Sequence, residues 1–161
     1  MPLQPLPPHA RRAVPADAAE VLRLRQVMID ALFDADTSTD WHRESLPTLR
    51  ARLAADDGFA AFVVDHPDRP GALAALVAGT VEYRIGRATN PHGTTGTVFS
   101  VATDPETRRR GCARACMTVL LDWFREQGAQ RVQLTSSAAG SSLYAGLGFR
   151  PKPYPLLELH L

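Results

Sequence analysis

The chain combines two periodicities of apolar residues, one typical of helices and one typical of strands. Helical spacing near the N-terminus predicts two amphipathic helices, with apolar positions at Val21, Leu24, Met28, Ala31 and Leu32 in the first and at Leu46, Leu49 and Leu53 in the second. Asp17, with Glu20 three residues on, stands where the cap of the first helix is expected. Asp57-Gly58 ends the second helix.

Apolar runs bounded by turn residues predict a sheet in the remainder of the chain. Strands are expected at 59–64, 73–85, 97–103, 131–135 and 157–161. A helix at 109–127 separates the third strand from the fourth, and a short helix at 141–147 separates the last two. This order of elements predicts an α+β fold whose sheet contains one parallel crossover.

Length and composition narrow the class of protein. With 161 residues we expect a flexible tail over 1–10 and a single domain over 11–161. The formal net charge of +1 offers no broad surface for nucleic acid or for a membrane. The proline-rich start is not typical of a signal peptide, and Cys112 and Cys116 lack the second ligand pair of a zinc site. We therefore expect a cytoplasmic protein and no metal.

The strongest chemical signal lies at the start of the helix at 109–127. A strand is followed there by the turn Asp104-Pro105 and by the pattern Arg108-x-x-Gly111-x-Ala113. A glycine-bearing turn at a helix N-terminus exposes backbone N–H groups where the helix dipole is positive, which suits a phosphate or pyrophosphate. The adjacent arginines add charge-assisted hydrogen bonds to the same oxygens.

This segment resembles the coenzyme A site of the GNAT family of N-acetyltransferases, and two further segments fit the same family. Arg12-Ala13 and Asp17 precede the first helix as in that family's usual opening, and the stretch 141–149 resembles its Tyr-x-x-Leu-Gly-Phe segment. The three segments occur in the family's order and the resemblance covers 12–161. It implies a mixed, mostly antiparallel central sheet with helices on both faces, and acetyl-CoA as cosubstrate.

The resemblance also implies roles for individual residues. Val101 and Thr103 would bind the pantetheine arm through the exposed backbone of a strand that splays from its neighbour. The pyrophosphate would be bound by Arg108, Arg109, Arg110, Gly111, Cys112, Ala113 and Arg114. Tyr144 would protonate the departing CoA thiolate, and a backbone N–H near Val101 would stabilise the oxyanion. The alternatives are a packing role for Tyr144 and a solvated helix start for the arginines.

The general base is where the sequence departs from the family. Many relatives carry a glutamate early on the strand before the turn, where this chain has Thr97. Glu82, on the preceding strand, is the first candidate for the catalytic base. His92, Asp104 and a chain of water molecules are the alternatives.

Acidic residues gather between the first two helices, a region that borders the acceptor pocket in GNAT-like folds. Our hypothesis is that they focus a negative potential on the pocket and favour a cationic amine, the alternative being a hydrated loop. These residues are Asp34, Asp36, Asp40 and Glu44. Trp41 in the same segment would supply an aromatic wall or pack on the core.

The sequence thus predicts an acetyl-CoA-dependent N-acetyltransferase that acts on a primary amine of a small molecule or peptide by direct attack in a ternary complex. A catalytically inactive acyl-CoA-binding or sensing module on the same fold is the alternative, because it would explain the missing family glutamate. Near-neutral charge disfavours a nucleic-acid-binding role for the arginine run. The apolar C-terminal strand suits a homodimer.

Overall fold

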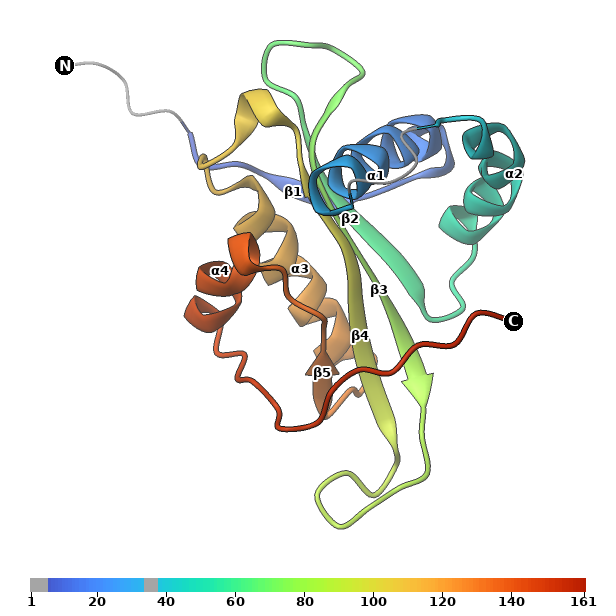
Figure 1. Cartoon of the computed structure of the whole chain (residues 1–161), viewed down its shortest axis with the longest axis vertical. Coiled ribbons are helices and arrows are strands. Elements are labelled where there is room, and N and C mark those ends of the chain that lie inside the picture. The colour runs from blue at the N-terminus through green and yellow to red at the C-terminus, as the bar shows by residue number, and fades with distance from the viewer. Residues whose placement is uncertain (1–5, 34–37) are drawn as a thin grey trace, which may run out of the picture.

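The computed structural model describes residues 6–33 and 38–161, so the predicted acidic residues Asp34 and Asp36 lie outside the described part (Figure 1). The elements, in chain order, are β1 (Ala10–Arg12), η1 (Pro15–Asp17), α1 (Ala18–Leu32), α2 (Trp41–Ala54), β2 (Phe59–Asp65), β3 (Leu73–Tyr83), β4 (Thr94–Thr103), η2 (Pro105–Thr107), α3 (Cys112–Glu126), β5 (Arg131–Gln133), η3 (Ala138–Gly140) and α4 (Ser141–Gly146).

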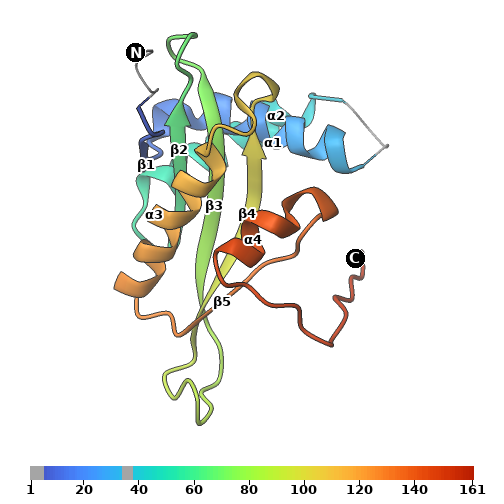
Figure 2. The ribbon, with the colours of Figure 1, turned by 90° about the vertical axis from the view of Figure 1, so that its left-hand side faces the viewer.

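The strands of the described residues form one mixed sheet in the order β1-β2-β3-β4-β5. The first four strands pair antiparallel, whereas β5 pairs parallel to β4 after the crossover through α3. Helices α3 and α4 cover one face of the sheet, and α1 and α2 cover the other (Figures 1 and 2). The predicted α+β class, the mostly antiparallel sheet and the helices on both faces are confirmed.

The core between α3 and the sheet depends on two strand glycines. Phe124 of α3 is fully buried. A Cβ at Gly96 would lie 2.7 Å from Phe124 Cδ1, and a Cβ at Gly79 would lie 2.6 Å from its Cζ. The absence of these side chains lets the helix pack directly on the sheet backbone, in a close-packed interior where small changes of volume are felt.

A second core lies on the opposite face, beneath α1 and α2. Leu24 of α1 packs there with Val63 and Leu76, each of them inaccessible to solvent. Because both faces of β2 and β3 are covered by helices, these strands are apolar along nearly their whole length. The long apolar run that predicted β3 has this cause.

Several predicted boundaries differ from the structure. The predicted tail at 1–10 overlaps β1 at Ala10, and β1 itself was not predicted. Helix α3 begins at Cys112 rather than at Arg109, because Arg109 adopts a left-handed φ of 61° in the turn before it. Asp17 does stand at the N-cap of α1, but its carboxylate accepts from the Val14 N–H and not from the helix.

The predicted C-terminal strand is wrong. Residues 157–161 pair with no strand, and Leu157, Leu159 and Leu161 are all exposed. Alternation of apolar and polar residues indicates that a strand would have two distinct faces, but it does not show which strand it would pair with. In this structure the segment has no partner strand among the described residues. Among the described residues, no helix has both the length and the apolar character needed to cross a bilayer. The organisation as a single domain over 11–161 stays a prediction.

Candidate active site

The central opening of the molecule lies where β4 and β5 separate. Their parallel ladder is short, joining Thr95–Thr97 to Arg131–Gln133. Beyond it, β4 continues to Thr103 with no strand partner on that side among the described residues. Backbone groups along this edge of β4 are therefore free to bind an extended ligand.

A cavity of about 450 Å³, cavity 1, fills this opening. It is lined by Val27, Met28, Ala31 and Leu32 at the end of α1, by Val98–Thr103 of β4, by Arg108, Arg109 and Ala113, and by several residues between Leu134 and Tyr144. The structure thus brings together Val101, Thr103, Arg108, Arg109, Ala113 and Tyr144 of the predicted site. No acidic residue or histidine of the described chain lines cavity 1.

The turn at one end of cavity 1 presents a run of unused donors. Gly111 caps α3 in the left-handed conformation, with φ 79° and no side-chain cap. Among the described residues, the backbone N–H groups of 109–114 have no acceptor, and the first bonded one is that of Ala115, to the Gly111 carbonyl at 3.0 Å. Adjacent free N–H groups at a helix N-terminus form an anion site.

The arginines of this turn have no acidic partners. Arg108, Arg109, Arg110 and Arg114 form no ion pair with a described residue. The Arg114 guanidinium lies against Gly146 of α4, 2.8 Å from the position that a Cβ there would occupy. Cys112 differs from its neighbours because its side chain is buried in the core, where burial raises the pKa of the thiol. Only its backbone N–H remains available to a ligand.

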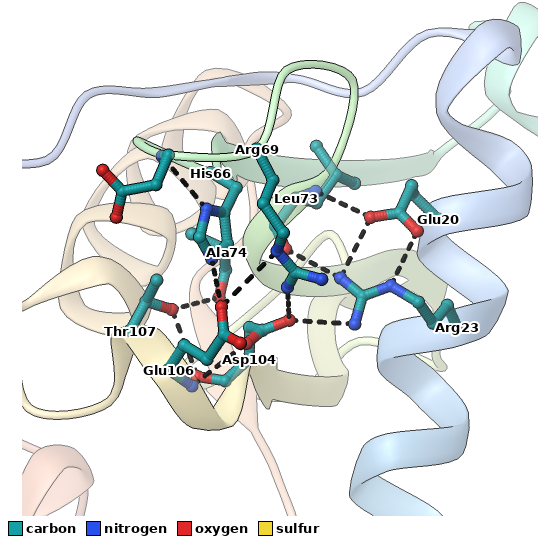
Figure 3. Close-up of polar contacts among 10 residues, drawn as sticks. Glu20, Arg23, His66, Arg69, Leu73, Ala74, Asp104, Glu106 and Thr107 are labelled. Carbon is teal, nitrogen blue, oxygen red and sulfur yellow. Dashed lines mark hydrogen bonds and ion pairs between the residues drawn. The ribbon is translucent and has the colours of Figure 1, made fainter.

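A buried carboxylate anchors the turn to the rest of the fold (Figure 3). Asp104, which is 2% exposed, accepts from Arg23 Nη1 of α1 at 2.9 Å and from Arg69 Nη2 at 2.6 Å. Its other oxygen accepts the Glu106 N–H at 3.0 Å and so caps η2. Burial raises the pKa of Asp104, but the Glu106 N–H and the Arg23 guanidinium lower it by more, so the net shift is downward.

The same region holds the one cluster of metal-ligating side chains found among the described residues. His66, Asp104 and Glu106 bring ligand atoms within 4.8 Å of one another. The Asp104 carboxylate is already neutralised by two guanidinium groups, and His66 Nε2 lies 3.3 Å from Glu106 Oε2. We assign this cluster to the ion-pair network that supports the turn.

Tyr144 lies in the wall of cavity 1 opposite β4. Its ring packs edge-on against Phe149, with centroids 6.0 Å apart, and against Gly140. The Phe149 N–H donates to the Tyr144 carbonyl at 3.0 Å, and Gly148 between them takes a φ of 95°. The phenolic hydroxyl has no hydrogen-bond partner among the described residues, and burial raises the pKa of Tyr144. The hydroxyl therefore stays protonated at neutral pH.

A bulge in β4 forms the floor of cavity 1. Phe99 pairs with Ala78 and Ala102 with Leu76, so β4 carries one residue more than β3 between these pairs. Ser100 within the bulge takes a left-handed φ of 56°, which is rare for a residue other than glycine. Strained backbone of this kind concentrates at functional sites.

A second cavity of about 520 Å³, cavity 2, lies between α1, α2 and the other face of the sheet. Phe99 and Ser100 line both cavities, so the β4 bulge is their common border. Trp41 and Glu44 also line cavity 2. The segment that the sequence connected with the acceptor thus contributes to this space, although Trp41 and Glu44 belong to α2 and not to a loop.

The candidate bases lie elsewhere. Glu82 lines neither cavity and is held on the surface by Arg84 at 3.1 Å and by the Thr97 hydroxyl at 3.1 Å. His92 is exposed in the connection between β3 and β4. The third candidate, Asp104, is engaged by the arginines described above.

Sequence reasoning missed two residues at the border between the cavities. Arg25 of α1 lines cavity 2 and donates to the Ser100 hydroxyl at 2.5 Å. The helical pattern placed Arg25 next to an apolar stripe without showing which strand it would meet. No pattern in β4 marked the bulge at Ser100.

Comparison with known proteins adds the family and the fold. The model of the Acetyltransferase (GNAT) family matches residues 27–149. A GCN5-related N-acetyltransferase from Ralstonia eutropha is 25% identical with a TM-score of 0.77, covering 94% of this chain and 97% of that one. A predicted acetyltransferase from Clostridium acetobutylicum, solved with acetyl-CoA, is 21% identical with a TM-score of 0.78, covering 94% and 95%.

A more distant likeness is to a glucosamine-6-phosphate N-acetyltransferase from Arabidopsis thaliana, 16% identical with a TM-score of 0.70, covering 93% of this chain and 96% of that one. No curated protein matches the chain. The likeness to these structures over nearly their whole lengths confirms the predicted fold.

Proposed function

Because this chain belongs to the acetyltransferase (GNAT) family, we propose that it transfers an acetyl group from acetyl-CoA to a primary amine of a small molecule or peptide. The observation that carries the proposal is the run of unbonded N–H groups at 109–114, which closes one end of cavity 1 beside arginines without acidic partners. A pyrophosphate bound there takes its hydrogen bonds from backbone and side chain together.

The open edge of β4 is the proposed binding position of the pantetheine arm of acetyl-CoA. A pantetheine arm has amide groups at intervals, as a peptide does, and can add to a free strand edge through backbone hydrogen bonds. Thr103 lies on this edge between the turn and the bulge, Val101 lies within the bulge, and both line cavity 1. In this arrangement the thioester reaches the bulge near Ser100, where cavity 2 begins.

The proposed reaction is direct attack in a ternary complex. The neutral amine forms a bond to the thioester carbonyl carbon, and a backbone N–H near Val101 stabilises the oxyanion. The carbon–sulfur bond then breaks, the thiolate takes the Tyr144 proton, and the nitrogen loses its proton to a base. Tyr144 is suited to its role because it lines cavity 1, and its hydroxyl is protonated and has no hydrogen-bond partner among the described residues.

The base is proposed to act through water. Cavity 1 offers no carboxylate or imidazole among the described residues, and a water chain through cavity 2 requires none in direct contact with the amine. Glu82 stays a sequence-based prediction for this role, and its position outside both cavities does not favour it. A Glu82→Gln variant with unchanged kcat would contradict that assignment.

The lack of an acidic residue in cavity 1 also favours one other function, an acyl-CoA-binding module without turnover. Both functions require that the protein binds acetyl-CoA, and calorimetric titration tests this binding. The wild type should bind, and a variant carrying Arg109→Ala and Gly111→Ala should lose binding. A folded wild type that does not bind acetyl-CoA contradicts both functions, whereas binding without acetylation of any member of a broad amine panel favours the module.

Two further features belong to the same proposal. We propose a homodimer formed through the C-terminal segment, because Leu157, Leu159 and Leu161 are exposed together with Tyr154 and Leu156. Light scattering should give a dimer for the full chain and a monomer for a chain that ends at Arg150.

A cytoplasmic location is also proposed, and the free, buried cysteines Cys112 and Cys116 fit a reducing compartment.

A further inference from the structure

The guanidinium of Arg25 is a charge without a counterion at the border of the two cavities. Its Nη1 donates to the Ser100 hydroxyl at 2.5 Å, and no acidic residue of the described chain pairs with it. Arg23, two residues earlier on the same helix, is by contrast bonded to Glu20 and Asp104. Arg25, on the side of α1 that faces cavity 2, thus lacks the acidic partners that Arg23 has.

An unneutralised guanidinium that is half-buried has lost part of its hydration without gaining a carboxylate. An anion that reaches this guanidinium can form charge-assisted hydrogen bonds with it without displacing a carboxylate. Its one partner, Ser100, is itself held in a left-handed conformation at φ 56°. Strain in the backbone and an uncompensated charge at the same point are both typical of a ligand site.

The other residues that line cavity 2 indicate which chemical groups, besides an anion, a ligand there would have. Phe59 and Phe99 form one wall with ring centroids 6.1 Å apart. Trp41 forms another, and its indole N–H is fixed by the Gln26 side chain at 2.9 Å. An apolar or aromatic group of a ligand can therefore pack against these aromatic side chains.

We propose that cavity 2 binds an α-amino acid with an apolar side chain, whose carboxylate pairs with Arg25. This inference rests on the proposed function, since it names the acceptor of that reaction. The planar guanidinium offers a carboxylate two parallel hydrogen bonds, and the aromatic walls take the side chain. The amine of such a ligand is two bonds from its carboxylate, beside Ser100 and thus at the border with cavity 1.

The charge of Glu44 fits the same ligand. Glu44 also lines cavity 2 and forms no ion pair with a described residue. Two unpaired charges of opposite sign around one apolar space match a zwitterion better than a polyamine, because a polyamine would leave Arg25 facing a further cation. Arg52, the remaining arginine of cavity 2, is already paired with Asp57.

Ligand-observed NMR tests this inference without requiring turnover. The probes are L-phenylalanine, L-leucine and L-methionine, each compared with its primary amide, which keeps the amine and side chain but lacks the negative charge. Wild-type protein should bind the acids about tenfold or more tightly than the amides, as expected for a charge-assisted hydrogen bond. Arg25→Gln should remove this preference, and Arg25→Lys should retain part of it.

The matched control is Arg50→Gln, which removes an exposed arginine of α2 that lines neither cavity. It should bind the acids as the wild type does. Equal binding of acids and amides, a preference that persists in Arg25→Gln, or no binding of any acid would each overturn the inference. Tighter binding of O-phosphoethanolamine than of the acids would overturn the carboxylate assignment.

The proposed function is tested separately by titrating the same samples with CoA. Unchanged CoA affinity in Arg25→Gln shows that the variant is folded, so a lost acid preference then reports on the anion site. A wild type that does not bind CoA would contradict the proposed function. The comparison of acids with amides would still decide whether Arg25 binds a carboxylate. In turnover, Arg25→Gln should raise the KM for the amino acid and leave the KM for acetyl-CoA unchanged.

Discussion

The carboxylate of Asp104 accepts a hydrogen bond of 2.9 Å from the guanidinium of Arg23, and this contact joins the turn after β4 to helix α1. Asp104 is three residues past the edge of β4 that borders cavity 1 at Val101, and four residues before Arg108. One ion pair with a buried carboxylate therefore holds the proposed pyrophosphate turn against helix α1, which forms another wall of cavity 1.

Replacement of Asp104 by Asn should destabilise the fold more than an ordinary surface change. The substitution leaves Arg23 and Arg69 facing a neutral amide at a position that is itself 2% exposed, although the two arginine side chains are 34% and 45% exposed. Removing one partner of a buried ion pair costs about 3–5 kcal/mol, and the amide oxygen recovers part of this. Urea denaturation should show a loss of about 2 kcal/mol. Asp122→Asn, which breaks an exposed pair with Arg125, is the control and should cost less than about 1 kcal/mol.

Stability should fall in acid because three buried or half-buried carboxylates, those of Asp17, Glu20 and Asp104, have lowered pKa values. Hydrogen bonds from Arg11 lower the pKa of Asp17, and the Glu106 N–H and Arg23 outweigh burial to lower that of Asp104. A lowered folded-state pKa contributes stability above the ordinary value of 3.8, and that stability is lost as the pH falls through it and below. The free energy of unfolding should decrease as the pH falls from about 5 to about 2, and less so in Asp104→Asn. Identical pH profiles for the two proteins would contradict this account.

How far the sequence predicts this fold depends on whether an element is specified by its own residues. Apolar periodicity alone located α1, α3, β2 and β3, because each of these buries a stripe or face that the pattern records. Strand β1 has no such pattern, since its three residues are held by pairing with β2 and by ion pairs of Arg11 with Asp17 and Asp65. The segment 157–161 has the pattern without a partner strand and stays exposed.

The residues of the candidate site also differ in whether local sequence or strand pairing determines their position. The turn at Arg108–Gly111 could be predicted because its glycine and its place before a helix follow from local backbone geometry. The contact of Arg25 with Ser100 spans 75 positions and depends on a bulge that exists only when β4 pairs with β3. Glu82 was a reasonable candidate for the base on its strand, but the face it occupies is decided by pairing, and Arg84 holds it outside both cavities.

Gly111→Ala and Gly128→Ala form a matched pair that separates strain from ligand binding. Both glycines have a φ near 80°, and a Cβ at either position meets no atom within 4 Å. Each alanine should therefore cost about 1–2 kcal/mol of stability through left-handed strain. Only Gly111→Ala should also weaken acetyl-CoA binding, because relaxation of the turn misaligns the free N–H groups. Calorimetry should show unchanged affinity in Gly128→Ala, and equal losses in both would contradict the assignment of the turn.

Tyr144→Phe should reduce kcat while leaving the Kd for acetyl-CoA nearly unchanged. The substitution removes only the hydroxyl, which has no hydrogen-bond partner among the described residues, and keeps the ring packed on Phe149. Loss of a general acid lowers the rate by about 10²–10⁴-fold. Because burial raises the pKa of Tyr144, ionisation of this residue should not limit the wild-type rate below about pH 10. Tyr83→Phe, at a tyrosine that is 80% exposed, is the control and should retain full turnover. Equal kcat values for the two variants would show that Tyr144 serves packing alone.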